Sequence, residues 1–332
     1  ALELGVCYYP EHWPETQWEP AARRMAAMGI RYVRIAEFAW HLMQPSPKEF
    51  DFGWLDRAIR ALHAHGLKVV LGTPTATPPK WLVDRHPAIL PVGADGQVRK
   101  FGSRRHYSFS SEVFWDYSQE IVRAVAKRYG EHPAVVGWQL DNEFGCHGTV
   151  RSYDNASLEG FQVWLHHKYH NISALNAAWG TVFWAQRYDS FAAVGLPNLA
   201  VTEANPGAQL DFYRYSSDKV ADYAVMQRNI IRPYSPHRFI THNFMGFFLE
   251  FDHWRFQQRT GLDFASWDSY PLGFTDTTLG LGDIFTDDEK GQFSATGHPD
   301  VSSLHHDLYH ALGKGPFWVM EQQPGPVNWA EH

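Results

Sequence analysis

Apolar runs of strand length alternate with helical segments along the chain, and this alternation constrains the fold more than any other feature of the sequence. We predict strands at residues 4–9, 32–36, 68–72, 135–140, 238–242, 262–267 and 316–320. We predict helices at residues 18–28, 51–65, 111–129, 157–169, 207–232 and 302–312. Most of the strand segments lack strict polar–apolar alternation, as expected for strands that are buried on both faces. Strands that alternate with helices predict a parallel sheet.

Seven such repeats favour the α/β class and a (β/α)₈ TIM barrel, with a doubly wound sheet as the alternative. No G-x-G-x-x-G follows the first strand, which argues against a dinucleotide-binding sheet. The eighth strand and helix of the barrel have no candidate, because only eleven residues follow Glu321. We therefore expect either a barrel that lacks its eighth strand and helix within this sequence or a strand count that is off by one.

Polar residues terminate several of the predicted strands. They are Glu37, Asn142, Glu143, His242, Asn243, Asp268 and Glu321. Catalytic residues of a (β/α)₈ barrel lie at the C-terminal ends of its strands. A single carboxylate at such a position can equally cap a helix or pair with an arginine. Two glutamates that end the fourth and seventh strands, on opposite sides of the ring, favour one shared site.

Paired carboxylates in aromatic surroundings are typical of glycoside hydrolysis. One carboxyl group must protonate the leaving oxygen, and the other must stay ionised to attack the anomeric carbon. In a retaining enzyme the two groups lie about 5–5.5 Å apart, and we expect this spacing for Glu143 and Glu321. Aromatic residues make up 15% of the chain. They suit either a large core or the apolar faces of sugar rings.

Composition excludes several other classes of function. The net charge is −7 and no basic stripe is present, so we predict no nucleic-acid partner. No apolar run approaches the roughly 20 residues of a membrane span, so we predict no membrane partner. Two cysteines, Cys7 and Cys146, cannot build a disulfide framework, and no signal peptide is recognisable. These features predict a cytoplasmic protein. The 19 histidines form no HExxH motif, so we predict no metal ligands among them.

Six motifs in this sequence, in this order, resemble those of the family-42 β-galactosidases, a family in the retaining clan with glutamates after strands four and seven. They are YYPEHWP (8–14), VRIAEFAW (33–40), GSRRHYSFSS (102–111), WQLDNEFGCH (138–147), AWGTVFWAQRY (178–188) and MEQQPGPVNW (320–329). The similarity runs from near residue 5 to the end of the chain.

The resemblance implies roles for eight residues. Glu143 matches the acid/base, Glu321 the nucleophile and Asn142 the amide that holds the 2-hydroxyl of the sugar. Arg34, Glu37 and Arg104 match polar residues of the galactose pocket, and Trp184 and Trp329 match its aromatic walls. Two other interpretations stay open. Arg34 can be a buried ion-pair partner of Glu37, and Trp184 can pack within a loop.

The sequence departs from the family pattern at a metal site. Many members carry four zinc-binding cysteines, and the matching positions here are Ser108, Ser152, Asp154 and Ser157. Three hydroxyls and one carboxylate hold zinc poorly, so we predict no structural zinc.

The resemblance therefore implies a retaining β-galactosidase that acts on β-galactosides and needs no cofactor. Alternatives are a clan relative acting on other β-glycosides or α-L-arabinopyranosides, and a non-catalytic sugar-binding barrel. Family members are longer than this sequence. We expect residues 1–332 to be a C-terminally incomplete catalytic TIM-barrel domain that further domains follow, and we leave a homo-oligomer open.

Overall fold

Seven parallel strand positions follow one another around the structure, as the sequence predicts. The computed structural model describes residues 2–277, 284–325 and 327. Its strands are β1 (Leu4–Cys7), β2 (Ile30–Ile35), β3 (Lys68–Gly72), β4 (Val135–Gln139), β5 (Phe239–Thr241), β6 (Asn243–Phe244), β7 (Ser266–Ser269) and β8 (Trp318–Gln322). One ladder joins β1 to β5 in chain order and a second joins β6, β7 and β8. Only His242 separates β5 from β6, so these two pieces occupy one strand position.

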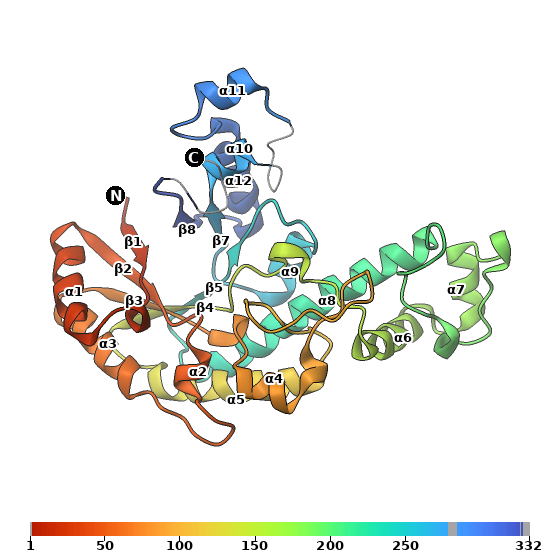
Figure 1. Cartoon of the computed structure of the whole chain (residues 1–332), viewed down its shortest axis with the longest axis horizontal. Helices are drawn as coiled ribbons and strands as arrows, with labels where there is room; N and C mark the ends of the chain where they lie inside the picture. The colour runs from red at the N-terminus through yellow and green to blue at the C-terminus, as the bar shows by residue number, and fades with distance from the viewer. Residues whose placement is uncertain (1, 278–283, 326, 328–332) are drawn as a thin grey trace.

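Helices follow the strands and cover the outside of this strand layer (Figure 1). They are α1 (Trp18–Ala27), α2 (Trp40–Met43), α3 (Gly53–Ala64), α4 (Lys80–Arg85), α5 (Glu112–Tyr129), α6 (Asn155–Tyr169), α7 (Ile172–Trp179), α8 (Pro206–Ile231), α9 (His253–Thr260), α10 (Pro271–Asp276), α11 (Asp287–Gln292) and α12 (Pro299–Gly313). The hydroxyl oxygen of Ser111 caps α5 by accepting a hydrogen bond from the backbone N–H of Phe114 at 3.3 Å.

Aromatic side chains fill the end of the strand layer at which the strands begin. The Trp318 ring lies 4.8 Å from that of Tyr32 and 5.1 Å from that of Phe239. Phe239 in turn lies against Gly137, where an added Cβ would come within 2.2 Å of the Phe239 ring. Packing closes this end, and the polar residues lie toward the other end of the strands.

Two predicted strands lie several residues further along the chain than expected. The sixth strand, predicted at 262–267, is Ser266–Ser269, and the seventh, predicted at 316–320, is Trp318–Gln322. Asp268 and Glu321 therefore lie within strands rather than after them. The reason is that these strands carry polar side chains toward the interior, which a search for apolar runs misses.

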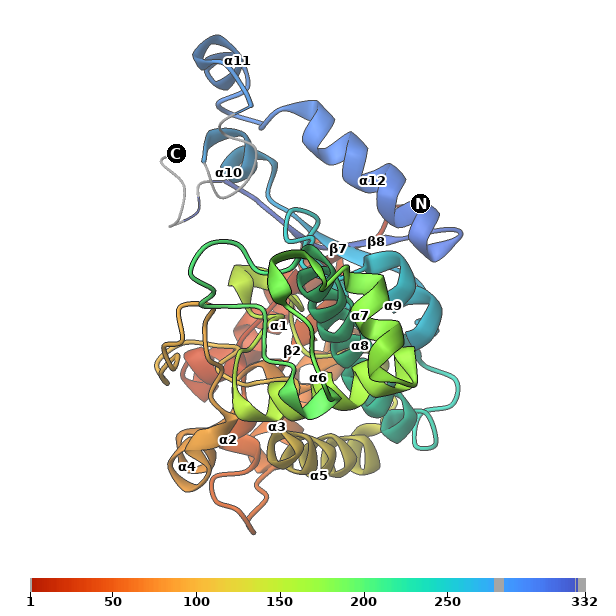
Figure 2. The ribbon, with the colours of Figure 1, turned by 90° about the vertical axis from the view of Figure 1, so that its right-hand side faces the viewer.

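Residues 155–215, which we call the arm, extend away from the strand layer (Figures 1 and 2). The arm contains α6, α7 and the first turns of α8, and it has its own apolar cluster, which includes Phe161, Leu175 and Phe212. The long helix α8 continues from the arm to the strand layer and packs there on α5 and α9.

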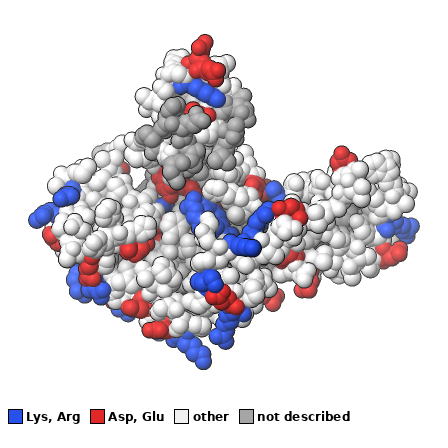
Figure 3. All heavy atoms as spheres, viewed as in Figure 1, with Lys and Arg blue, Asp and Glu red and all other residues white. Residues whose placement is uncertain are grey.

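The C-terminal lobe contains α10, α11 and α12 above β7 and β8 (Figure 1). Trp267 of β7 stacks on His305 and Tyr309 of α12, with ring centroids 5.0 and 5.7 Å apart. Within the described ranges, no helix combines the length and apolarity that crossing a membrane requires. On the face shown in Figure 3, acidic and basic side chains are interspersed and form no basic stripe.

Candidate active site

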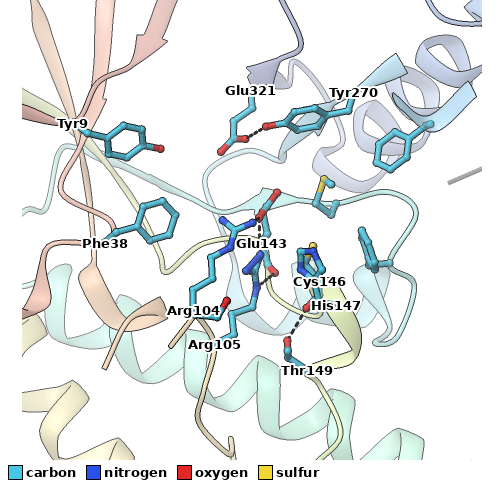
Figure 4. A pocket seen from close by; sticks show the side chains of 14 residues that line it. Tyr9, Phe38, Arg104, Arg105, Glu143, Cys146, His147, Thr149, Tyr270 and Glu321 are labelled. Carbon is cyan, nitrogen blue, oxygen red and sulfur yellow. Dashed lines mark hydrogen bonds and ion pairs between the residues drawn. The ribbon is translucent and has the colours of Figure 1, made fainter. Parts of the chain in front are cut away.

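A cavity of about 630 Å³ lies at the C-terminal ends of the strands. Both predicted catalytic glutamates line it, together with Arg104, Arg105 and the aromatic side chains of Tyr9, Phe38 and Tyr270. Figure 4 shows Glu143 and Glu321 reaching into this space from different elements. Charged groups and ring faces therefore share one pocket, as sugar binding requires.

The acid/base candidate Glu143 lies just after β4, where the backbone is strained. Asp141 and Glu143 have φ angles of 51° and 47°, which non-glycine residues rarely adopt. A carboxylate oxygen of Glu143 accepts hydrogen bonds from Arg105 at 2.6 Å and from Asn142 Nδ2 at 2.9 Å. Arg104 pairs with the same oxygen at 3.1 Å. These contacts fix the carboxyl group at the wall of the pocket.

The nucleophile candidate Glu321 lies in β8 and receives donors from two other strand positions. Arg34 of β2 donates to one carboxylate oxygen at 2.5 Å, and the Tyr270 hydroxyl donates to the other. Burial opposes ionisation of this carboxyl, but the charge of Arg34 and the two hydrogen bonds outweigh it and lower the pKa of Glu321. The group is therefore held as an anion, the form that a nucleophile needs.

Arg34 and Glu37 lie beneath the pocket surface and form a buried ion pair, as one interpretation of the sequence predicted. The Arg34 side chain is 2% exposed, that of Glu37 is fully buried, and the two pair at 3.0 Å. Arg34 also donates to Gln139 at 2.8 Å. Glu37 packs against Gly72 so closely that a Cβ there would lie 2.5 Å from the Glu37 Cβ. Contacts with Glu37 and Gln139 therefore fix the Arg34 guanidinium in the position from which it donates to Glu321.

Three carboxylates converge at the centre of the site. One oxygen each of Glu143, Asp268 and Glu321 lies within 4.8 Å of the other two. For the two glutamates this separation is shorter than the roughly 6.5–9.5 Å of inverting glycosidases and suits a retaining pair. Three carboxylates can also ligate a divalent cation. Here arginines already pair with Glu143 and Glu321, and a cation would be repelled by them.

Comparison with known proteins identifies the family. Residues 7–332 match the model of glycoside hydrolase family 42, whose description is "Beta-galactosidase". The chain belongs to this family. It is 57% identical over 329 residues to a β-galactosidase of Thermus thermophilus, covering 99% of this chain and 50% of the relative.

Solved structures of the family have the same fold. A crystal structure of the β-galactosidase from the psychrophilic Marinomonas ef1 superposes with a TM-score of 0.96 at 53% identity, covering 100% of this chain and 50% of that one. The β-galactosidase from the Antarctic haloarchaeon Halorubrum lacusprofundi gives 0.94 at 45%, covering 100% and 48%. The α/β fold of family-42 catalytic barrels is thereby established. The chain spans about half the length of the curated relatives it matches.

Of the eight residues that the family resemblance singled out, the structure gathers six. Glu143, Glu321 and Arg104 line the pocket, and Asn142, Arg34 and Glu37 support it from below. Arg104 also lies over the Phe38 ring, 5.6 Å from its centroid.

The structure does not bring Trp184 into this pocket. Trp184 lies in the arm, in a short 3₁₀ turn (Phe183–Ala185). It stacks on Phe183 and is 65% exposed. Trp184 is therefore not among the residues that line this cavity, and its assignment to an aromatic wall stays a prediction. Trp329 lies outside the described residues.

Three further residues contact the glutamates and were not assigned to the site from the sequence. Arg105 and Tyr270 bond directly to Glu143 and Glu321. Asn243 accepts from the backbone N–H of Glu143 at 3.1 Å and donates to Asp268 at 2.7 Å. A signal existed for each, since Arg105 is the second arginine of the GSRRHYSFSS motif and Asn243 follows the strand predicted at 238–242. Tyr270 follows Asp268, the polar residue that marks the sixth strand.

Three of the four positions that match the zinc ligands of many family members, Ser152, Asp154 and Ser157, form a hydrogen-bonded network instead. Asp154 accepts from Ser152 and, at 2.8 Å, from the backbone N–H of Ser157. Ser157 donates to Ser110 at 3.0 Å. The serine hydroxyls donate to the Asp154 carboxylate and to Ser110, and such a set does not fit zinc. None of these residues lines the cavity that holds Glu143 and Glu321.

Proposed function

We propose that this chain carries the catalytic site of a retaining β-galactosidase that hydrolyses terminal β-D-galactosyl residues. The observation that carries the proposal is the approach of the Glu143 and Glu321 carboxylates within 4.8 Å in one pocket. Membership of a family described as β-galactosidases supports the choice of substrate.

In the first half of the proposed reaction, the Glu321 carboxylate attacks the anomeric carbon. The bond from that carbon to the aglycone oxygen breaks, and Glu143 gives its proton to the departing oxygen. The product is a galactosyl ester of Glu321. Arg34 and Tyr270 keep the attacking carboxylate ionised and oriented before the substrate binds.

In the second half, Glu143 removes a proton from water and the water oxygen attacks the anomeric carbon. The ester bond to Glu321 breaks, and galactose leaves with its original β configuration. We assign contacts with the sugar hydroxyls to Arg104 and Asn142, and second-layer support of the pocket to Arg34 and Glu37. Polar groups placed this way would tell galactose from isomers with a displaced hydroxyl.

We further propose that the eighth barrel unit and additional domains lie outside the described residues. Seven strand positions among the described residues, and coverage of about half of each relative, support this. The free cysteines Cys7 and Cys146 support the predicted cytoplasmic location. A homo-oligomer stays a prediction, to be tested by light scattering.

Hydrolysis of a nitrophenyl β-galactoside, by this chain and by the intact protein, tests the activity. The product should appear first as the β-anomer in NMR spectra. A dinitrophenyl 2-deoxy-2-fluoro-β-galactoside should label one peptide, at Glu321. A label on another residue or an α-anomeric first product contradicts the assignment. Faster turnover of α-L-arabinopyranosides or another β-glycoside changes the substrate, and galactose binding without turnover by the intact protein indicates a sugar-binding barrel.

A further inference from the structure

Asp268 is a third carboxyl group at the centre of the site, and the proposed mechanism does not use it. It lies in β7, fully buried, and is the cross-strand partner of Glu321 in β8. The register between these strands shifts just before Asp268, and this irregularity sets the two acidic residues opposite each other. Like charges at directly opposite positions of neighbouring strands repel.

The two oxygens of Asp268 have different surroundings. One accepts a hydrogen bond from Asn243 at 2.7 Å. The other, Oδ1, is buried and has no hydrogen-bond partner within the described ranges. An ionised carboxylate accepts hydrogen bonds on both oxygens, and leaving one buried oxygen without a donor is costly.

The neighbouring positive charges belong to other carboxylates. Arg34 pairs with Glu37 and Glu321, and Arg105 pairs with Glu143. The titratable groups that face Asp268 are Cys7 of β1, Arg34 of β2, Glu143 and Cys146 after β4, Tyr270 after β7, Tyr309 of α12 and Glu321 of β8. Arg34 is the one cation among them, and Glu321 and Glu37 already hold it.

We propose that Asp268 is a positioning residue that remains protonated throughout the reaction and carries its proton on Oδ1, the oxygen that Asn243 does not contact. This inference rests on the proposed function. Burial, followed by the charges of Glu321 and Glu143, raises the pKa of Asp268 well above its ordinary value. The proton stays on Asp268, and no bond to it forms or breaks during turnover.

A neutral carboxyl group in this place serves both halves of the reaction. Before attack, the negative charge of the three carboxyl groups lies on Glu321. In the galactosyl-enzyme it lies on Glu143. A neutral Asp268 adds no charge in either state, whereas an ionised Asp268 would add a second negative charge in each.

The substitution Asp268→Asn tests the proposal, because an amide keeps an acceptor for Asn243 and a donor in place of Oδ1. We expect D268N to retain kcat within about threefold. D268A should lose about 10–100-fold, because the amide of Asn243, which also accepts from the Glu143 backbone N–H, is left without its buried acceptor. Below neutral pH, the kcat/KM profile of D268N should superpose on that of the wild type, since a neutral group replaces a neutral group.

Infrared difference spectra between the wild type and D268N provide a readout that needs no activity. The wild type at neutral pH should show a carbonyl band of a protonated carboxylic acid that D268N lacks. Absence of the band, a displaced D268N profile or a D268N loss as large as that of D268A overturns the proposal. Activity that requires added Mg²⁺ or Ca²⁺ after chelation also overturns it. A wild type that shows the band and hydrolyses no galactoside refutes the proposed function and leaves the protonation of Asp268 standing.

Discussion

Asp211 in the arm and Asp268 at the site are both buried aspartates, and their surroundings are opposite. Asp211 is 1% exposed and pairs with Lys168 and Arg214. It also accepts hydrogen bonds from Tyr169 at 2.6 Å and Trp179 at 3.0 Å. Among the residues that the structure describes, Asp268 has one hydrogen-bond donor, the amide of Asn243. Burial raises the pKa of both groups, but the donors around Asp211 outweigh it and leave the pKa lowered, while that of Asp268 is raised.

The difference separates what holds the fold together from what the site requires. A buried charge with matched donors can stabilise the fold around it, whereas a buried acid between two other carboxylates costs stability. The arm should therefore respond to substitution with lost stability, and the site with lost activity. The predictions below test this division.

The largest expected effect is on activity, at the two glutamates. E321A should abolish turnover, since no covalent intermediate can form. E143A should lose about 10²–10⁴-fold on substrates with poor leaving groups. With a dinitrophenyl galactoside and azide, E143A should form β-galactosyl azide and E321A should form α-galactosyl azide. NMR spectra of the products distinguish them.

The matched control is D211N, which should retain the kcat of the wild type at temperatures where it is folded. If E143A yielded the α-azide, the acid/base and nucleophile assignments would be exchanged.

A smaller loss should follow removal of the Tyr270 hydroxyl. Y270F should lower kcat by about 10–100-fold, because a hydrogen bond to a charged group is lost. Since this hydroxyl helps to lower the pKa of Glu321, the acidic limb of kcat/KM should move to higher pH. Y169F, which removes a hydroxyl from Asp211 in the arm, should leave that limb in place. An unmoved limb in Y270F would contradict the role of Tyr270.

In the arm, D211N should lower the free energy of unfolding by about 1–3 kcal/mol, because buried donors lose a charged acceptor. The folded pKa of Asp211 is lowered, so its stabilisation is present above the unfolded value of about 3.9 and is lost as pH falls through the folded pKa. Urea unfolding at several pH values measures this. Equal stability of D211N and wild type near neutral pH would contradict it.

The smallest expected effect has the opposite sign. The folded pKa of Asp268 is raised, so its contribution to stability falls as pH rises from the unfolded value of about 3.9 toward the folded pKa. D268N removes that cost, and near neutral pH it should unfold at a slightly higher urea concentration than the wild type. A destabilised D268N would place Asp268 in the same class as Asp211.

The sequence was most informative where one physical rule dominated. Parallel strands that are apolar on both faces appear in the sequence as continuous apolar runs. The strand predicted at residues 68–72 is one of these, and it coincides with β3. The same rule misplaced the sixth strand. In Ser266–Ser269 the outward Trp267 packs on α12, while Ser266 and Asp268 are polar residues of the interior. The helix α7 was missed, because it is short and lies between two longer helices.

The glutamates could be predicted from their places at strand ends, but their partners could not. Arg105 is 38 residues from Glu143 in the chain, and Tyr270 is 51 residues from Glu321. No local pattern links residues at such distances, and an adjacent arginine, Arg104, was an equally good candidate. Trp184 is a different case. The family resemblance indicates a role for this residue, but the sequence does not indicate that it lies in the arm.

The ion pair between Arg34 and Glu321 joins residues 287 positions apart in the chain. During synthesis, which proceeds at about 5–20 residues per second, N-terminal parts emerge first. The ladder from β1 to β5 and the acid/base at its edge can form while β8 is still unmade. The nucleophile and its strand are made later than β1 to β5, and contacts of such long range form slowly. Until β8 is made, Arg34 therefore has one of its two carboxylate partners, Glu37, and lacks the other, Glu321.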